Sequence, residues 1–286
     1  MEYSLKNLKT SLSVKGIAYV HFFEFQRDFF TKTEKHPFYE LVFVSSGALD
    51  INSDEFTGKL EKNQMIIHRP DEFHSLSCDK GSNPTVIIIG FSCTGNVIDS
   101  FSKSPVTLGV SGIQKLAEII KEARNLFSPP YNIPLYDMKI KKNSPFGSEQ
   151  MLGGLLEYFL ISAIREFLSG TVRDNSDSPE RFSVNEIVSY ISDNYKEKIT
   201  LDELAFIFRT NRSTLCKEFK NATGKTIVEF MNNLKIEEAK NKIISSDLTF
   251  TEIAEDLNFD GIHYFTRLFK LITGLSPKEF RNKNRR

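Results

Sequence analysis

Two short segments near the C-terminal end carry side chains that could hydrogen-bond to the edges of nucleic-acid bases. In each segment apolar residues recur at helical spacing, and the positions between them are mostly polar or basic. These positions are Arg212, Ser213, Cys216 and Lys217 in the first segment and Ile262, His263, Thr266 and Arg267 in the second. Such groups suit a helix that lies in the major groove of DNA, because base edges there present a pattern of hydrogen-bond acceptors and donors. Each segment therefore predicts a base-reading helix, with Lys217 and Arg267 as the first candidates.

The same segments are flanked by groups that could bind backbone phosphates. Free N–H groups at a helix N-terminus favour anions, and lysines beside the groove add positive charge. We expect phosphate contacts from Asn211, Lys220, Lys270 and Arg286. The alternative is that these side chains form only a solvated helix face. A redox role for Cys216 would need an electropositive, exposed setting for the thiol.

The element that would position these groups occurs twice. Residues 201–230 and 250–280 repeat one pattern of helix, polar turn and second helix. The matching positions are Leu204-Ala205 with Ile253-Ala254 at an offset of 49, and Leu215, Phe219-Lys220, Thr223-Gly224 and Phe230 with Phe265, Phe269-Lys270, Thr273-Gly274 and Phe280 at an offset of 50. The later copy therefore has one extra residue in its turn. The pattern predicts a duplicated helix-turn-helix.

The second copy also carries a recognisable signature. The residues from Phe259 to Lys270 and from Thr273 to Arg281 resemble the signature of the AraC/XylS family of bacterial transcription regulators. The similarity covers about a hundred C-terminal residues. It implies two helix-turn-helix units joined by a long helix, with the family's base-reading positions at Ser213, Cys216, Lys217, Ile262, His263 and Arg267. This chain departs from the family pattern at Asn258, where glycine is usual, and at Gly261, where a polar residue is more common.

Up to about Cys93 the chain reads as short β-strands. Segments rich in β-branched and aromatic residues alternate with turn residues, which is typical of a small antiparallel barrel or jelly roll. The expected strands are Ala18–Phe25, Tyr39–Val44, Ala48–Ile51, Gln64–His68 and Thr85–Phe91. The run from His36 to Gly47 and the run from His68 to His74 are similar to the cupin-type sensor domain that precedes the DNA-binding domain in many AraC-family members.

This β-domain is also where a small molecule would bind. The candidates for an effector pocket are Tyr19, His36, Tyr39, Glu40 and His74. Cupin enzymes bind metal through histidines and a carboxylate on facing strands, so a metal centre is the alternative role for His36, Glu40 and His74. Metal-binding cupins use a denser His-x-His arrangement, whereas Phe38 stands where a second histidine would follow His36. We therefore expect no metal site and no cofactor. The aromatic residues of Phe22–Phe25 and Phe29-Phe30 are expected in the core.

Helices follow the strands. Apolar spacing predicts helices over Val110–Phe127 and Glu149–Leu168, and the apolar stripe of the second is too broad for a lone surface helix. By resemblance to the family, this second helix would form a dimer contact through Leu152, Leu155, Leu156, Phe159 and Ile164. A polar stretch at 173–182 reads as a linker, followed by helices over Val184–Tyr195 and Thr226–Ser245. We therefore expect an α+β chain with two domains: residues 1–172, cupin-like with helices at about 110–170, and an all-α DNA-binding domain at 183–286.

Composition narrows the class of protein. The 286 residues carry 37 basic and 37 acidic side chains, so net charge gives no support for nucleic-acid binding, and that expectation rests on the repeat. Three scattered cysteines argue against a disulfide framework and favour a reducing compartment. No apolar run is long enough to span a bilayer, and the first residues lack the apolar core of a signal peptide. We expect a cytoplasmic protein that does not bind membranes.

These expectations combine into one functional hypothesis. The chain is expected to be a regulator that binds double-stranded DNA, acts as an activator by analogy with the family, and responds to a small molecule in its β-domain. It would act as a homodimer and not as an enzyme, and the resemblance also allows RNA polymerase as a partner. One alternative is a metal-dependent cupin enzyme with an appended DNA-binding domain. Another is a regulator without a ligand, controlled by its abundance or by a protein partner.

Overall fold

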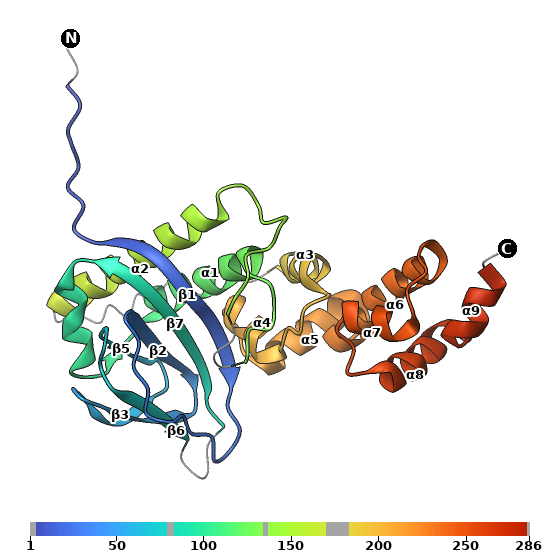
Figure 1. The fold of residues 1–286 in the computed structure, drawn as a ribbon, viewed down its shortest axis with the longest axis horizontal. Coiled ribbons are helices and arrows are strands. Elements are labelled where there is room, and N and C mark those ends of the chain that lie inside the picture. Colours follow the sequence, from blue (N-terminus) through green and yellow to red (C-terminus); the bar gives the residue numbers. More distant parts are fainter. Residues whose placement is uncertain (1–3, 79–82, 134–136, 170–182, 285–286) are drawn as a thin grey trace. The chain divides into compact units, whose positions relative to one another are not determined.

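The computed structural model describes residues 4–78, 83–133, 137–169 and 183–284 (Figure 1). The chain divides into two compact units, Met1–Ser178 and Pro179–Arg286. They are called the N-terminal unit and the C-terminal unit below, and each is described by itself. The linker expected at 173–182 lies outside the described residues.

The N-terminal unit is built on two antiparallel sheets. The larger sheet has the strand order β1-β7-β2-β5-β8, and the smaller sheet has the order β4-β3-β6. The strands are β1 (Ser13–Glu24), β2 (Tyr39–Ser46), β3 (Ala48–Ser53), β4 (Thr57–Glu61), β5 (Gln64–His68), β6 (His74–Cys78), β7 (Thr85–Thr94) and β8 (Val106–Thr107). All five strands expected from the sequence are present, and β4, β6 and β8 were not anticipated.

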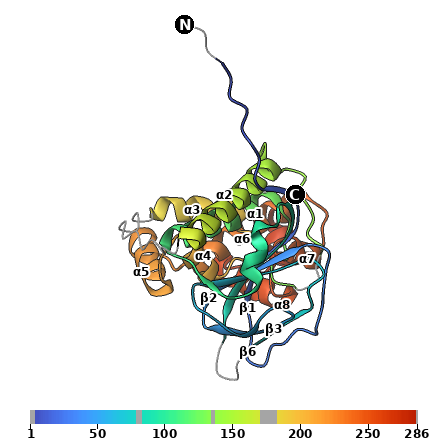
Figure 2. The ribbon, with the colours of Figure 1, turned by 90° about the vertical axis from the view of Figure 1, so that its left-hand side faces the viewer.

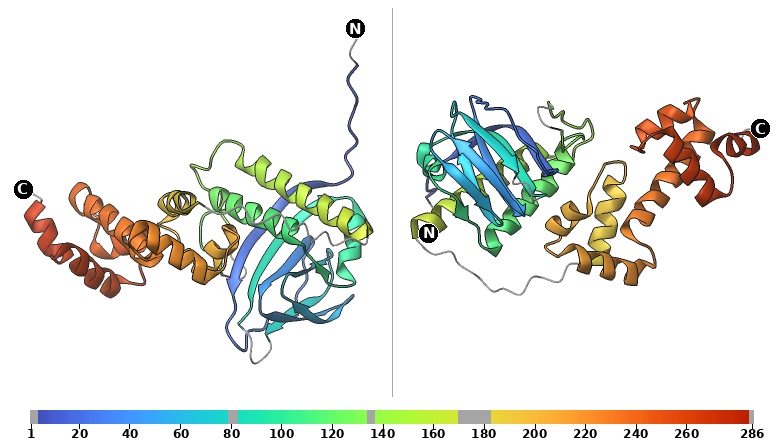
Figure 3. Two further views of the ribbon diagram at one scale, coloured as in Figure 1. Left: turned by 180° about the vertical axis from the view of Figure 1, so that it is seen from behind. Right: turned by 90° about the horizontal axis from the view of Figure 1, so that it is seen from below.

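Two helices pack together against the larger sheet. A 3-10 helix, η1 (Asn96–Ser102), precedes α1 (Val110–Leu126) and α2 (Ser148–Ser169). Figure 2 and the left view of Figure 3 show α1 and α2 side by side over the strands. Both helices match the sequence-based expectation to within one residue at each end.

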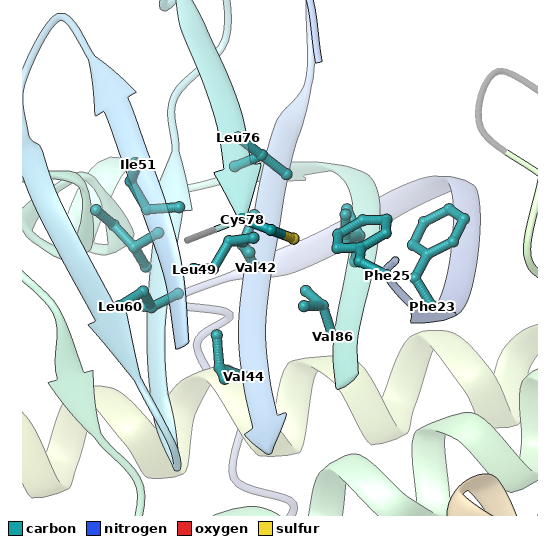
Figure 4. Packing of buried hydrophobic residues seen from close by; sticks show 12 residues of the cluster. Phe23, Phe25, Val42, Val44, Leu49, Ile51, Leu60, Leu76, Cys78 and Val86 are labelled. Atoms are coloured by element: carbon teal, nitrogen blue, oxygen red, sulfur yellow. The ribbon is translucent and has the colours of Figure 1, made fainter. Parts of the chain in front are cut away.

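The core of the N-terminal unit follows from the two-residue period of a strand. In β2, Val42 and Val44 belong to the cluster between the two sheets, while Leu41 and Phe43 point to the opposite face. All four side chains are fully buried. The central strands are therefore apolar on both faces, because one face meets the smaller sheet and the other is covered by helices. Figure 4 shows the side chains of this cluster, which includes Val42 and Val44, gathered between the strands.

The C-terminal unit is made of helices. The described helices are α3 (Val184–Asn194), α4 (Leu201–Ile207), α5 (Arg212–Thr223), α6 (Ile227–Ser245), α7 (Phe250–Asp256), α8 (Ile262–Thr273) and α9 (Pro277–Asn284). We call α4 with α5 the first helix pair and α7 with α8 the second helix pair. The right view of Figure 3 shows the long helix α6 between the two groups. No helix among the described residues is long and apolar enough to cross a membrane.

Local sequence explains where these helices begin and end. The hydroxyls of Thr200, Thr226 and Thr249 each accept a hydrogen bond from a backbone N–H in the first turn of the helix that follows. The helices α5 and α8 both end at a glycine in the left-handed conformation, Gly224 with φ 73° and Gly274 with φ 79°. The repeat seen in the sequence is thus a repeat of capping chemistry as well as of apolar positions.

Candidate nucleic-acid interface and ligand pocket

The helices α5 and α8 are held on their supports in the same way. Phe219 packs edge-to-face on Phe230 with ring centroids 5.5 Å apart, and Phe269 packs on Phe280 at 5.4 Å. Both Phe219 and Phe269 are fully buried. Each helix therefore has one face fixed by an aromatic anchor and an opposite face that is free to carry polar groups.

The exposed face of α5 carries most of the residues expected to read bases. Arg212, Ser213 and Lys217 are exposed, and Cys216 is half-buried. The Arg212 guanidinium lies 3.6 Å from the carboxylate of Asp202, and its side chain is 61% exposed. A pair this exposed is weak, so the guanidinium remains available to another anion.

The residues expected to contact phosphate beside α5 differ in their surroundings. The amide oxygen of Asn211 accepts a hydrogen bond from the Thr214 N–H at 2.8 Å and so caps the helix. This bond fixes the side chain, and its amide N–H₂ can still donate to a phosphate. Lys220 is exposed on the last turn of α5, where a cation is also favoured by the helix dipole.

Most of the α8 residues that were expected to point outward are exposed. His263, Arg267 and Lys270 are exposed, and Thr266 is half-buried. The Arg267 guanidinium lies 5.7 Å from the ring centroid of Tyr264. Arg286, also expected to contact phosphate, lies outside the described residues.

Ile262 corrects one expectation. It was expected to point outward, but it is partly buried and packs against the core cluster that includes Phe265 and Phe269. Ile262 is the first residue of α8, where the helix packs against this core cluster. The helix begins after Gly261, which has φ 98° and makes no side-chain cap. A non-glycine residue is strained in that conformation, which explains the departure from the polar residue that is usual there.

Asn258 connects the second helix pair to the rest of the C-terminal unit. Its φ of 50° is in the left-handed region, which accounts for the glycine that is usual at this position. Its side-chain amide donates to the Lys196 carbonyl at 2.9 Å, and its own carbonyl accepts from the Lys235 ammonium at 2.9 Å. Lys198 and Asp260 add an ion pair at 3.3 Å. The turn of the second helix pair is thus bonded both to the loop before α4 and to α6. No local pattern in the sequence predicted this network, because its members are up to 62 residues apart.

The buried Lys235 ammonium predicts an unusual pH dependence of stability. Burial lowers the pKa of Lys235 to about 8, although the nearby Asp260 opposes the shift. Between this value and the unfolded pKa of 10.5 the Lys235 side chain is protonated in the unfolded chain but not in the folded one, so its contribution to the free energy of unfolding should rise with pH. We expect this contribution to increase by an amount on the order of 1–2 kcal/mol between about pH 7.5 and 9.5.

Chemical denaturation of the full chain, followed by circular dichroism, measures this rise. The rise should be much smaller in Lys235→Met, which has no group to titrate there. The exposed Lys278 provides the matched variant Lys278→Met, in which the rise should persist. A rise of equal size in Lys235→Met would show that Lys235 is not its source.

A pocket of about 410 Å³ opens in the N-terminal unit. One wall is a ladder of rings on alternate positions of β1 and just beyond it, where Tyr19, His21, Phe23 and Phe25 stack with successive centroids 5.0 Å apart. The other lining residues are Phe29, Phe30, Thr31, Lys32, Glu34, Lys35, His36, Phe38, Glu40, Leu76 and Ile88. Of the aromatic residues expected in the core, Phe23 and Phe25 are buried and also face the cavity, whereas Phe30 is 71% exposed, so its assignment to the core was wrong.

The structure brings most of the expected pocket residues together. Tyr19, His36 and Glu40 line the pocket, and the Nε2 atom of His74 lies 3.4 Å from Glu40 Oε1. Tyr39 is not among the lining residues, because it points to the opposite face of β2 and its hydroxyl donates to Asp99 at 2.8 Å. The assignment of Tyr39 to the pocket is therefore corrected.

The polar end of the pocket is centred on the buried carboxylate of Glu40. The Tyr19 hydroxyl donates to Glu40 Oε2 at 2.5 Å, and His36 Nε2 lies 3.5 Å from the same oxygen. Burial alone would favour the neutral acid, but the imidazoles of His36 and His74 outweigh it and lower the pKa of Glu40. Burial and the charge of Glu40 together raise the pKa of the nearby Glu34. The pocket thus combines aromatic walls with one fixed negative charge.

The residues expected to form a dimer contact on α2 also need correction. Leu152, Leu156 and Phe159 are fully buried inside the N-terminal unit, and Leu155 and Ile164 are half-buried. The broad apolar stripe of α2 is explained by packing on α1 and β1. The exposed apolar side chains of α2 are Met151, Tyr158, Phe167 and Leu168.

Comparisons with known proteins show which families and relatives this chain is similar to. A helix-turn-helix domain model matches residues 204–283. An uncharacterized HTH-type transcriptional regulator of Bacillus subtilis (strain 168), YfiF, is 25% identical over 285 residues, which is 92% of this chain and 83% of the relative. Another, YdiP of Escherichia coli (strain K12), is 29% identical over 251 residues, covering 85% of this chain and 78% of the relative.

Among solved structures, the C-terminal domain of AraT, a response regulator from Geobacillus stearothermophilus, covers 37% of this chain and 91% of its own length. It is 26% identical, with a TM-score of 0.35. The helix-turn-helix model covers both helix pairs, and the full-length relatives are regulators of transcription. With the signature at residues 259–281, these findings show that the chain carries an AraC-type helix-turn-helix domain and is similar over most of its length to DNA-binding regulators of transcription.

Proposed function

We propose that α5 and α8 each enter the major groove and read bases, so that one protomer contacts two successive turns of DNA. The observation that carries this proposal is the repeated design, in which a buried phenylalanine anchors each helix and a polar, basic face is left exposed. Arg212, Ser213 and Lys217 on α5 and His263 and Arg267 on α8 supply donors of the kind that recognise base edges. Successive major grooves on one face are about 34 Å apart.

Phosphate contacts would come from residues beside these faces. Lys220 and Lys270 are exposed at equivalent positions near the ends of α5 and α8. A lysine at such a position adds affinity without reading sequence, because phosphates are the same at every base pair. Base contacts and phosphate contacts should therefore respond differently to mutation.

The N-terminal unit is proposed to bind a small-molecule effector that controls transcription, with activation as the output. A pocket of about 410 Å³ with aromatic walls and a few convergent polar groups has the features of a ligand site. Dimerisation through exposed side chains of α2, such as Tyr158 and Leu168, would present two DNA-binding units to RNA polymerase at one promoter.

Replacing Arg267 and Lys270 separately tests the base-reading assignment. Arg267→Ala should weaken binding by about 1–3 kcal/mol for sequences with the preferred base and relax preference at one position only. Lys270→Ala should weaken binding to all sequences to a similar extent and reduce the slope of affinity against salt by about 1. Selection of duplexes from a random pool by the purified chain, followed by titration at several salt concentrations, measures both effects.

Lys62→Ala is the matched control for this experiment, because Lys62 is an exposed lysine of the N-terminal unit. Its selected sequences and salt slope should equal those of the unchanged chain. If Arg267→Ala selected the same sequences with the same stringency as the unchanged chain, α8 would not read bases through Arg267.

A further inference from the structure

The helices α5 and α8 differ in the residue that stands beside their long cationic side chain. Lys217 on α5 and Arg267 on α8 occupy equivalent positions of the repeat, at an offset of 50. Three residues earlier, α5 has Thr214 and α8 has Tyr264. Residues three apart on a helix are neighbours, and a side chain leans back over the preceding turn. The side chain at position 264 therefore lies where it controls the direction of the side chain at position 267.

The Arg267 guanidinium lies over the Tyr264 ring, 5.7 Å from the ring centroid. This distance is within the range in which the face of an aromatic ring attracts a cation. Among the described residues, Arg267 makes no hydrogen bond and no ion pair. The ring thus restricts the guanidinium without occupying its N–H donors, and all of them remain available to a base edge.

Tyr264 is itself held by two other elements. Its hydroxyl accepts a long hydrogen bond, 3.4 Å, from the side-chain amide of Asn232 on α6. Its ring centroid lies 6.4 Å from that of Phe259, in the turn before α8. Phe259 packs against the core cluster of the second helix pair, and the Lys235 ammonium lies 5.4 Å from its ring centroid. The position of the Tyr264 ring is therefore set by α6 and by this turn as well as by α8.

The helix α5 has no equivalent arrangement. Thr214 has no ring, and within the described part of the chain no aromatic face lies against the Lys217 ammonium. A free lysine side chain loses more conformational freedom on binding than a guanidinium that is already restricted, and it lacks a planar fork that matches a base edge. Lys217 and Arg267 should therefore contribute unequally to sequence preference.

We propose that Tyr264 is a positioning residue that orients the Arg267 guanidinium before DNA binds, so that α8 discriminates between bases more sharply than α5. This inference rests on the proposed reading of bases by α8. Tyr264 acts through Arg267, because it limits the conformations from which the guanidinium is selected on binding. An oriented guanidinium favours guanine, whose O6 and N7 atoms accept two hydrogen bonds from one planar fork.

Competition binding of the full chain to duplexes that differ at a single base pair tests the role of Tyr264. The base pair is the one at which Arg267→Ala loses preference in the random-pool selection. Tyr264→Leu keeps an apolar side chain but removes the ring, and it should weaken discrimination there about two- to fivefold, the effect of losing an exposed cation–π contact. Tyr264→Phe should restore the discrimination, since the aromatic face remains.

A double-mutant cycle separates positioning from a general structural effect. In the background of Arg267→Ala, Tyr264→Leu should cause no further loss of discrimination at this base pair, because the guanidinium through which the ring acts is absent. An undiminished effect in that background would overturn the proposal, as would full discrimination in folded Tyr264→Leu. Arg267→Ala should also lose more discrimination than Lys217→Ala, and the reverse order would contradict the sharper role of α8.

Tyr195→Leu is the matched control. Tyr195 is a half-buried tyrosine of the same unit whose ring lies 6.0 Å from the Lys196 ammonium, and its replacement should leave discrimination unchanged. Circular dichroism reports folding of each variant, and Tyr264→Met provides the same test if Tyr264→Leu does not fold. If Arg267→Ala left base preference intact, the proposed function of α8 would fail. If Arg267→Ala lost preference but folded Tyr264→Leu and Tyr264→Met did not, only the positioning role would be refuted.

Discussion

Phe269→Ala should destabilise the second helix pair by about 3–5 kcal/mol, the usual cost of removing a fully buried phenylalanine. Phe269 is 0% exposed and belongs to the cluster that joins α6, α7 and α8. Its ring also packs on Phe280, which ties α9 to the same core. Because small domains are stable by only about 5–15 kcal/mol, the loss should release α8 from its support. Hydrogen exchange of the full chain, resolved along the sequence, should show faster exchange from α7 to α9.

Leu271→Ala is the matched control for this prediction. Leu271 is on the same helix but is 79% exposed, so its truncation should change exchange little. Phe219→Ala should produce the equivalent effect in the first helix pair, because Phe219 packs on Phe230 as Phe269 packs on Phe280. If Phe269→Ala left exchange in α8 unchanged, the aromatic anchor would not be the main support of that helix.

Lys217→Ala combined with Arg267→Ala should remove about 2–6 kcal/mol of sequence-specific binding free energy. Each side chain should supply about 1–3 kcal/mol of base discrimination. The two residues lie on different helix pairs, so their contributions should be nearly additive. The measurement is competition binding between the duplex selected by the unchanged chain and an unrelated duplex, for both single variants and the double variant.

The double variant shows whether both α5 and α8 read bases or only one of them does. Binding to the unrelated duplex should fall much less than binding to the selected duplex, because non-specific affinity comes from phosphates. The control variant Lys62→Ala should leave the ratio of the two affinities unchanged. A double variant no weaker than Arg267→Ala alone would mean that only α8 contributes base contacts.

Helical elements were predictable because their signals are local. Capping residues lie directly beside the helix ends that they fix, as Thr200, Thr226, Thr249, Gly224 and Gly274 do. The helix boundaries expected from the sequence therefore agree with the observed ones to within one or two residues. The strand β4 was missed because Thr57–Glu61 is mostly polar and buries little more than Leu60. The strand β6 was missed because its apolar positions alternate with serines in a segment of only five residues, His74–Cys78.

The sequence suggested most residues of the ligand pocket, but not how they approach one another, because they come from distant segments of the chain. His36 and Glu40 are four residues apart, whereas His74 reaches Glu40 from β6 of the other sheet, and this strand was not anticipated. The stacked rings on β1 are a related case. Phe23 and Phe25 belong to the hydrophobic core and also line the cavity, so aromatic residues in a strand do not by themselves show which of the two they form. The burial of Leu152, Leu156 and Phe159 likewise depends on α1, which packs against them from another part of the chain.

Under the proposed reading of DNA by α5 and α8, the bonds made by Asn258 constrain which regulatory regions this protein can serve. Since the turn of the second helix pair is bonded to the Lys196 carbonyl and to Lys235 on α6, the two helix pairs cannot move apart independently. One additional base pair would move the distal contact by about 3.4 Å and rotate it by roughly 35° around the duplex. Target sites that use both readers must therefore keep a constant spacer, and mutations that lengthen or shorten it should be selected against even where every contacted base is intact.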